Sequence, residues 1–298
     1  DFWGDGVADD LVYGGDSGLW INGLQLFGSG TKVRDIAAAD IDSDGDLDLI
    51  IAVRNGNNLT IRNNTLKGPA FTTYVSPFFY RDTQNLLKSI ASVALSSLSD
   101  DSRAVAVADM NRDGQLDYVF ANAGSTANVW IDGASASVNN ISNDLLDTRD
   151  IALADVDQDG DMDVITGNSN ALNKIYLNDG NGGFPGAGAS IGGNSFATRS
   201  IASGDLNGDG LVDIVVGTAG GMGYFLNSGP TTLFGSVSGK QIGSSSAVVT
   251  DVILRDANND GRMDIIAARR NVSNALFLND GKAKPFKTTT AEHALSAD

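Results

Sequence analysis

The chain has 298 residues, of which 42% are hydrophobic, and a formal net charge of −17 from 37 acidic and 20 basic side chains. This hydrophobic content supplies a sizeable core, while the negative charge repels phosphate backbones and argues against a nucleic-acid partner. With no cysteine and one histidine, His293, the chain has no material for disulfides, thiol catalysis or clusters of histidine ligands.

One nine-residue pattern recurs six times, and we number its copies loop one to loop six. In chain order they are DFWGDGVAD from Asp1, DIDSDGDLD from Asp40, DMNRDGQLD from Asp109, DVDQDGDMD from Asp155, DLNGDGLVD from Asp205 and DANNDGRMD from Asp256. Consecutive copies begin 39 to 69 residues apart. A repeat of this length indicates an array of similar supersecondary units.

Each copy is flanked by short apolar runs that predict strands. A run of small and β-branched residues precedes the loop, as in 151–154, and a Val/Ile-rich run follows it, as in 211–216. An aromatic strand comes next, as in 175–177, and ends in Asn-Asp-Gly or Asn-Gly, which we interpret as hairpin residues with positive φ. A weaker fourth segment, around 71–75 or 286–290, completes a four-stranded unit.

These units predict an all-β fold, a β-propeller of four-stranded blades over a single domain, residues 1–298. We expect six blades, or seven if residues outside this chain contribute one. The C-terminal strand at 291–297 would close the ring beside the N-terminal segment. The second repeat is longer than the others, and we assign its excess, residues 81–102, to an insertion that forms a loop or a short helix. Apolar runs are too short for a membrane span.

The loop pattern points to a hard divalent cation. Oxygen-bearing side chains stand at positions one, three, five and nine, glycine at position six permits the turn, and position seven offers its carbonyl, which together favour Ca²⁺ over Mg²⁺. EF-hands are excluded because position twelve lacks Glu and strands flank the loop. The candidate ligands are Asp1, Asp5, Asp9, Asp40, Asp42, Asp44, Asp46, Asp48, Asp109, Asn111, Asp113, Gln115, Asp117, Asp155, Asp157, Asp159, Asp161, Asp163, Asp205, Asn207, Asp209, Leu211, Asp213, Asp256, Asn258, Asp260, Arg262 and Asp264.

The six loops are not equivalent, so we expect five or six Ca²⁺ ions. Loops two and four have five Asp each and should bind calcium most tightly. Loop one has Trp3 at the third ligand position and should be the weakest site or empty. Position nine is expected to close the shell of ligands with both carboxylate oxygens.

The repeats resemble FG-GAP/VCBS repeats, the calcium-loop blades of integrin α-subunit propellers and of many secreted bacterial, algal and fungal proteins. The resemblance covers essentially the whole chain and implies a calcium-binding β-propeller. Proteins with such repeats include adhesion modules, lectins and some polysaccharide lyases. The resemblance therefore implies a fold and a metal but leaves the activity open.

Four arginines, Arg34, Arg103, Arg149 and Arg199, stand six residues before a loop and would gather at one mouth of the channel. One hypothesis is an anion site for uronate or sulfate groups; the other is that each Arg pairs with a neighbouring acid such as Asp35 or Asp150. Trp3 is a second candidate for ligand contact, whereas Trp20 and Trp130 occupy a repeating aromatic position typical of the core between blades. We place the main contact surface on the arginine face together with residues 81–102.

Taken together, the sequence predicts an extracellular calcium-binding module, secreted or at the cell surface, that recognises glycans or proteins and is not an enzyme. One alternative is a polysaccharide lyase that uses His293 or a tyrosine, such as Tyr80 or Tyr118, next to an arginine, and another is a structural repeat of a larger surface or filament protein. The chain begins at Asp1, so we expect a processed form or a segment of something longer. Sequons at Asn58, Asn63, Asn140 and Asn271 are candidate glycosylation sites if the protein is secreted by a eukaryote.

Overall fold

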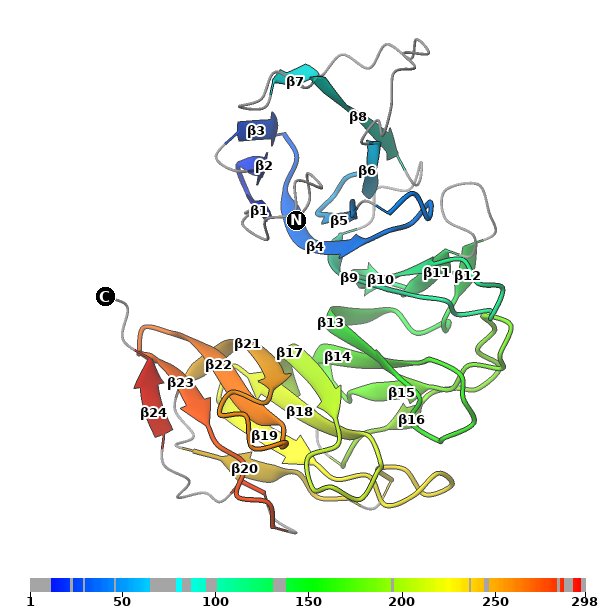
Figure 1. The fold of residues 1–298 in the computed structure, drawn as a ribbon. Coiled ribbons are helices and arrows are strands. Elements are labelled where there is room, and N and C mark those ends of the chain that lie inside the picture. Colours follow the sequence, from blue (N-terminus) through cyan, green and yellow to red (C-terminus); the bar gives the residue numbers. More distant parts are fainter. Residues whose placement is uncertain are drawn as a thin grey trace. The chain divides into compact units, whose positions relative to one another are not determined.

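A computed structural model shows a protein built from β-strands (Figure 1). It describes residues 12–21, 24–28, 30–45, 47–64, 79–81, 87–94, 101–130, 138–193, 196–235, 237–243, 247–282, 285–286 and 292–295. Within these ranges there is no helix, and hence none that could cross a membrane. The expected all-β class is confirmed, and the arrangement of many antiparallel strands in several sheets is propeller-like.

The chain divides into two compact units. The N-terminal unit comprises Asp1–Asp109, Asp113–Phe120 and Trp130–Val138, and the C-terminal unit comprises Met110–Arg112, Ala121–Val129 and Asn139–Asp298. Whether residues 1–298 act as one domain, and how many blades they form, stay predictions.

The N-terminal unit contains two complete antiparallel sheets. The smaller has the order β1 (Val12–Gly15), β2 (Gly18–Ile21), β3 (Leu24–Phe27). The larger has the order β4 (Val33–Ala39), β5 (Asp48–Val53), β6 (Leu59–Asn64), β8 (Leu87–Ala94), β7 (Phe79–Arg81). β9 (Ser102–Ala108) pairs with β10 (Asp117–Ser125), whose first residues belong to this unit and whose last residues belong to the other.

The assignment of residues 81–102 to a loop or short helix is wrong, because β8 lies within this segment. Strand β8 pairs antiparallel with β6 from Leu59↔Ala94 to Asn64↔Ser89. The free edge of β6 offers a row of backbone donors and acceptors, and a strand that arrives after a long connection satisfies them as well as one that follows directly. The fourth segment expected at 71–75 lies outside the described residues.

Strand β5 is buried on both faces, which explains its uninterrupted apolar sequence. Leu49, Ile51 and Val53 pack with Leu19 of β2 and Val33 of β4. The alternate residues Ile50 and Ala52 pack with Val105 of β9 and with Tyr118 and Phe120 of β10. A strand covered on both sides needs a continuous apolar run rather than an alternating one, so this unit is built by stacking sheets face to face.

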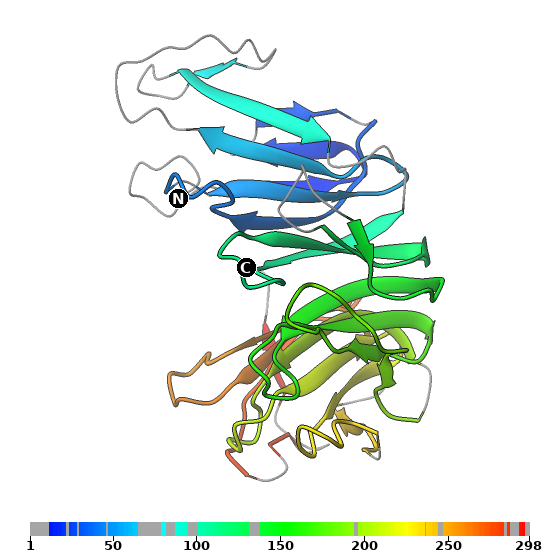
Figure 2. The same cartoon turned by 90° about the vertical axis from the view of Figure 1, so that its right-hand side faces the viewer.

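The C-terminal unit consists mainly of three antiparallel groups of four strands (Figures 1 and 2). The first has β13 (Leu146–Ala154), β14 (Asp163–Ala171), β15 (Lys174–Tyr176) and β16 (Ala189–Ser190). The second has β17 (Phe196–Gly204), β18 (Asp213–Thr218), β19 (Gly221–Phe225) and β20 (Lys240–Ile242). The third has β21 (Val248–Arg255), β22 (Asp264–Arg270), β23 (Asn274–Phe277) and β24 (Glu292–Leu295). The short strands β11 (Asn128–Trp130) and β12 (Val138–Asn140) follow β10.

Two consecutive residues of β18 show that the three groups of strands are stacked in layers. Val216 packs with residues of the first group, among them Ile165, whereas Val215 packs with residues of the third group, among them Ile265. The repeating aromatic position is buried between layers, since Tyr176, Phe225 and Phe277 are no more than 3% exposed. The expectation that this aromatic belongs to the core is confirmed at these three positions.

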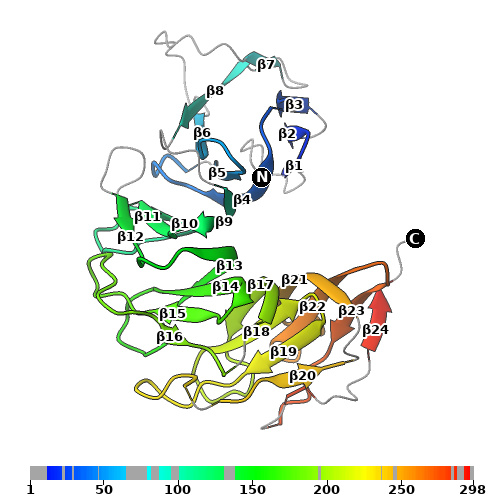
Figure 3. The ribbon, with the colours of Figure 1, turned by 180° about the vertical axis from the view of Figure 1, so that it is seen from behind.

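The expectation that the C-terminal strand, here β24, closes the ring beside the N-terminal segment is wrong. Strand β24 pairs antiparallel with β23, from Asn274↔Leu295 to Phe277↔Glu292, as the fourth strand of the last group (Figure 3). Its sequence resembles an innermost strand, but the neighbouring edge of β23 provides the hydrogen-bonding partner. Phe286, expected in that fourth strand, is instead buried against Tyr224 with ring centroids 5.9 Å apart.

Candidate metal centres

The loops join the first two strands of their groups and fold around the Asp at position one. In loop four, for example, the N–H of Gly160 donates to Asp155 Oδ2 at 3.0 Å. The same bond recurs from Gly45 to Asp40, from Gly114 to Asp109, from Gly210 to Asp205 and from Gly261 to Asp256. These glycines have φ between 82° and 94°, a left-handed conformation that a side chain would strain. The pattern thus specifies one turn in five loops.

Position four is also left-handed, which the sequence analysis did not anticipate. Ser43, Arg112, Gln158 and Asn259 have φ between 58° and 63°, and the remaining loop has Gly208 at this position. In loops three and four this side chain reaches the next loop: Arg112 Nη2 donates to the carbonyl of Asp159 at 3.3 Å, and Gln158 Nε2 donates to the carbonyl of Gly210 at 3.0 Å. Arg112 also forms an ion pair with Asp161 at 2.5 Å.

The Asp at position nine anchors loops four, five and six to the segment that follows the third strand. Asp163 is fully buried; its Oδ2 accepts the N–H of Val156 and its Oδ1 accepts the N–H of Asn178, both at 2.9 Å. Asp213 and Asp264 repeat both bonds at 2.7 to 3.0 Å. Burial raises the pKa of Asp163 and of Asp213 to about 6, and the backbone donors only partly oppose it.

The Asn that ends the third strand forms a bridge between loops. The side-chain amide of Asn178 donates to the carbonyl of Met110 at 2.7 Å, that of Asn227 to Val156 at 3.0 Å and that of Asn279 to Leu206 at 2.7 Å. The interpretation of these endings as positive-φ residues is confirmed for the glycines that follow, Gly180, Gly229 and Gly281, and is wrong for the Asn themselves. The three Asn recur at the same position of their repeats, and this recurrence in the sequence could have identified them as bridging residues.

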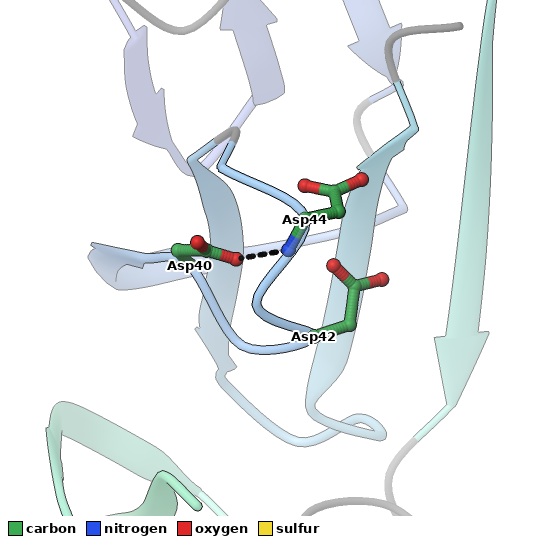
Figure 4. Close-up of side chains that lie close together, drawn as sticks. All are labelled: Asp40, Asp42 and Asp44. Carbon is green, nitrogen blue, oxygen red and sulfur yellow. Dashed lines mark hydrogen bonds between the residues drawn. The ribbon is translucent and has the colours of Figure 1, made fainter. Parts of the chain in front are cut away.

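Loops two and four each gather three carboxylates. Asp40, Asp42 and Asp44 each offer one oxygen within 4.8 Å of the others. Figure 4 shows these side chains around one turn, with the N–H of Asp44 donating to Asp40 Oδ1 at 3.1 Å. Asp155, Asp157 and Asp159 form the equivalent group.

Electrostatics at both groups favours a bound cation. Oδ1 of Asp42 and Oδ1 of Asp155 are buried and have no hydrogen-bond partner among the described residues. Burial, followed by the neighbouring carboxylates, raises the pKa of Asp42 and that of Asp157. Arg62, whose Nη1 is 3.6 Å from Asp42 Oδ2, opposes this shift in loop two. A divalent ion would accept the unpaired oxygens and relieve the repulsion.

The donor set fits calcium. Clustered carboxylates and exposed loop carbonyls are hard oxygen ligands, and Ca²⁺ takes six to eight of them in flexible geometry, whereas Mg²⁺ demands a near-ideal octahedron. Neither group includes the Asp at position nine, whose oxygens already accept backbone N–H groups, so its expected bidentate role stays a prediction. Asp46 and loop one, with Asp1, Trp3, Asp5 and Asp9, lie outside the described residues.

Loops five and six have Asn at position three, and no group of three carboxylates forms in them. In loop five the amide of Asn207 donates to Asp209 Oδ2 at 2.9 Å, and in loop six the amide of Asn258 donates to Asp260 Oδ2 at 2.8 Å. The guanidinium of Arg262 also contacts Asp260 Oδ2, and its Nε donates to the carbonyl of Asn279 at 3.0 Å. Loop six thus contains its own positive charge.

Most of the candidate arginines form internal ion pairs. Arg34 pairs with Asp16 at 2.7 Å, Arg103 with Asp101 at 2.5 Å and Arg149 with Asp147 at 2.6 Å. Arg199 is exposed and has no ion pair within the described ranges. These pairs favour the hypothesis of internal pairing, although with other acids than Asp35 and Asp150. Asp35 instead accepts the backbone N–H of Val105, and Asp150 accepts the backbone N–H of Ile201.

Other candidate residues occupy varied settings. Trp20 is only half-buried and stacks on the exposed Tyr13 with ring centroids 5.4 Å apart. The side chains of Trp130 and His293 lie outside the described set. Asn58 is buried and its side chain bonds to Val53 and Ser102, which makes it a poor glycosylation site, whereas Asn140 and Asn271 are exposed.

Comparison with known families gives a match to the model described as FG-GAP-like repeat. The matching segments are residues 40–120, 109–166, 155–216 and 205–267. They begin at position one of loops two to five and together span residues 40–267, well over half of the chain. No curated protein matches the sequence.

Solved structures resemble the fold at low sequence identity. Sqt1 of Saccharomyces cerevisiae gives a TM-score of 0.54 at 13% identity, covering 95% of this chain and 69% of that one. BBS1N in complex with ARL6DN gives 0.51 at 12% identity, covering 87% of this chain and 66% of that one. This chain thus spans about two thirds of the length of these proteins. At such identities the likeness shows the fold alone, and it supports a propeller module.

Proposed function

The chain belongs to the FG-GAP-like repeat family, and from this premise we propose that it is a calcium-stabilised β-propeller module of an extracellular protein. It recognises glycans or proteins and has no catalytic activity of its own. The observation that carries the proposal is the pair of three-carboxylate groups at Asp40–Asp42–Asp44 and Asp155–Asp157–Asp159, with buried acceptor oxygens that have no hydrogen-bond donor among the described residues.

Calcium has a structural role in this proposal. The loops connect the innermost strands, so repulsion within a loop opposes the pairing of the strands on either side, as at Ala154↔Asp163. An ion that binds only the folded loop stabilises the whole group by mass action. The extracellular location is supported by the usual occurrence of such repeats.

The recognition role is supported by how the scaffold uses its polar groups. The strands stack with both faces buried, as β5 does, so a rigid core presents the connecting loops. The loop carboxylates accept backbone N–H groups, which suits holding an ion rather than transferring protons. Arg34, Arg103 and Arg149 are already paired, so an anionic ligand would have to displace Asp16, Asp101 or Asp147.

Thermal unfolding tests the metal. We expect the melting temperature to fall by on the order of 10 °C in EDTA, because each saturated site contributes about 2.7 kcal/mol at a hundredfold excess over its dissociation constant. Excess calcium should restore it, and magnesium at the same concentration should restore it less. An unchanged melting curve in EDTA would contradict calcium stabilisation.

Incubation with uronic-acid polysaccharides separates recognition from the alternative of a lyase. The calcium-loaded protein should bind some members of a glycan or protein panel and release no unsaturated products, followed by their ultraviolet absorbance. Accumulation of such products, abolished by His293→Ala, would replace the recognition module with a lyase.

A further inference from the structure

Loops four and five, which lie in the same compact unit, are joined by two hydrogen bonds that run in opposite directions. Gln158 of loop four donates through Nε2 to the carbonyl of Gly210 in loop five at 3.0 Å. Asn227, which follows β19 in the group of loop five, donates through Nδ2 to the carbonyl of Val156 in loop four at 3.0 Å. Each loop therefore restrains the backbone of the other.

The peptide group of loop five that accepts the hydrogen bond from Gln158 also donates a hydrogen bond to a candidate calcium ligand. The carbonyl of Gly210 belongs to the same peptide group as the N–H of Leu211, and that N–H donates to Asp209 Oδ1 at 2.9 Å. One planar peptide thus connects Gln158 of loop four with the position-five carboxylate of loop five. Because hydrogen bonds in a chain polarise one another, fixing either end strengthens the other.

The second bridge connects to the anchor of loop four. The N–H of Val156, whose carbonyl accepts from Asn227, donates to Asp163 Oδ2 at 2.9 Å. The backbone N–H of Asn227 donates to Asp213 Oδ1 at 2.8 Å. The position-nine carboxylates of both loops are therefore tied to the same buried network.

We propose that loops four and five bind calcium cooperatively, through the Gln158 and Asn227 bridges. This inference rests on the proposed calcium binding. Metal at loop five orders Asp209 and the Gly210–Leu211 peptide, and that ordering fixes the acceptor of Gln158 and holds loop four in its binding conformation. The second ion then meets a loop whose ordering has already occurred, so it binds more tightly.

The neighbouring loop pair provides an internal comparison. Between loops five and six, Asn279 donates to the carbonyl of Leu206 at 2.7 Å, but position four of loop five is Gly208, which has no side chain. That pair has one bridge where loops four and five have two. Coupling between loops four and five should therefore exceed coupling between loops five and six.

Calcium titration of the full ¹⁵N-labelled chain tests the coupling site by site. The amides of Gly160 and Gly210 each donate to the position-one Asp of their own loop and so report its occupancy. Asp209→Asn weakens loop five without touching loop four. In the otherwise unchanged protein it should raise the calcium midpoint seen at Gly160 about fivefold, the lower end of typical coupling between sites.

Gln158→Ala leaves only the Asn227 bridge and should reduce this effect, so that Asp209→Asn moves the Gly160 midpoint much less than fivefold. Asn259→Ala is the matched control: Asn259 has the same loop position in loop six and a φ of 59°, beside 63° for Gln158. It replaces the same kind of left-handed residue and should leave the coupling intact. The amide spectrum itself verifies that each variant is folded.

The outcomes separate the two proposals. If Gly160 shifts with calcium but its midpoint ignores Asp209→Asn, the coupling is wrong and calcium binding stands. The coupling is equally wrong if Gln158→Ala leaves the fivefold effect in place. If neither Gly160 nor Gly210 responds to calcium, the proposed function fails, and the coupling fails with it.

Discussion

Loops four and six have the same framework but differ in how they balance charge. In both, the position-nine Asp is fully buried and accepts two backbone N–H groups, and an Asn amide bridges to the preceding loop. Loop four then brings oxygens of three carboxylates within 4.8 Å of one another, and Oδ1 of Asp155 has no hydrogen-bond partner in the described part of the chain. In loop six, Asn258 and Arg262 donate to Asp260 instead.

The difference separates two roles within one nine-residue motif. The anchor at position nine satisfies the backbone of two strands and needs no metal. The front positions, one to five, carry the charge that a cation must offset, and loop six offsets part of it with Arg262. A match to the motif therefore predicts the turn in every copy, whereas the need for metal depends on positions three and seven.

Removing the position-nine Asp should have the largest effect on the unfolding free energy, and this effect should be similar in loops four and six. Asp163→Ala leaves two buried N–H groups without an acceptor, and Asp264→Ala leaves one buried and one part-buried N–H group, at about 1–3 kcal/mol for each buried group. We expect Asp163→Ala to lose about 2–6 kcal/mol of unfolding free energy in EDTA, by chemical denaturation, and Asp264→Ala to lose a similar or slightly smaller amount. A loss confined to the calcium-loaded protein would show that position nine acts as a ligand rather than as an anchor.

The second prediction concerns pH in EDTA. Burial holds the pKa of Asp163 and Asp213 at about 6, above the ordinary 3.8, so the folded state keeps protons that the unfolded state has released. The unfolding free energy should therefore fall as pH rises from about 4 through about 6, by at most about 3 kcal/mol per group.

Calcium should reverse this slope, because the ion competes with protons for the carboxylates and binds better as pH rises. Urea denaturation between pH 4 and pH 7, with and without calcium, measures both slopes. Stability that rises with pH in EDTA would contradict the assignment of these buried carboxyls.

Exchanging position three between the loops should have a smaller effect. Asp157→Asn removes one of the three gathered carboxylates of loop four and should weaken calcium binding there on the order of tenfold. Asn258→Asp should strengthen binding at loop six by a similar factor. Calorimetric calcium titration measures both, and equal affinities before and after the exchange would mean that charge at position three does not distinguish the loops.

The smallest effect is expected at Arg262. Arg262→Gln removes the internal cation of loop six and should increase its calcium affinity by less than about 1 kcal/mol, because the guanidinium is 42% exposed and screened by water. Arg270→Gln removes the same charge at the exposed end of β22 and serves as the control. If both variants change calcium affinity equally, net charge rather than the Asp260 contact is responsible.

The repeat, the strands around it and the candidate ligands can all be predicted from the local sequence. Alternate oxygens in a turn of nine residues and a left-handed glycine at position six are local features, so the pattern at Asp155–Asp163 predicts its own conformation. The apolar runs that became β5 and β18 were recognisable for the same reason. Periodicity along one strand needs no knowledge of its neighbours.

Which segments pair with one another depends on the folded chain as a whole. β24 resembles an innermost strand in sequence but pairs with β23, and residues 87–94 pair with β6 after a long connection. The bridges from Gln158 and Asn227 join residues 52 and 71 positions apart. Backbone donors and acceptors at a sheet edge pair with any strand of suitable length, and the side-chain amide of Asn or Gln donates to any nearby carbonyl. Packing of the whole chain therefore selects the partner, and no local pattern records that choice.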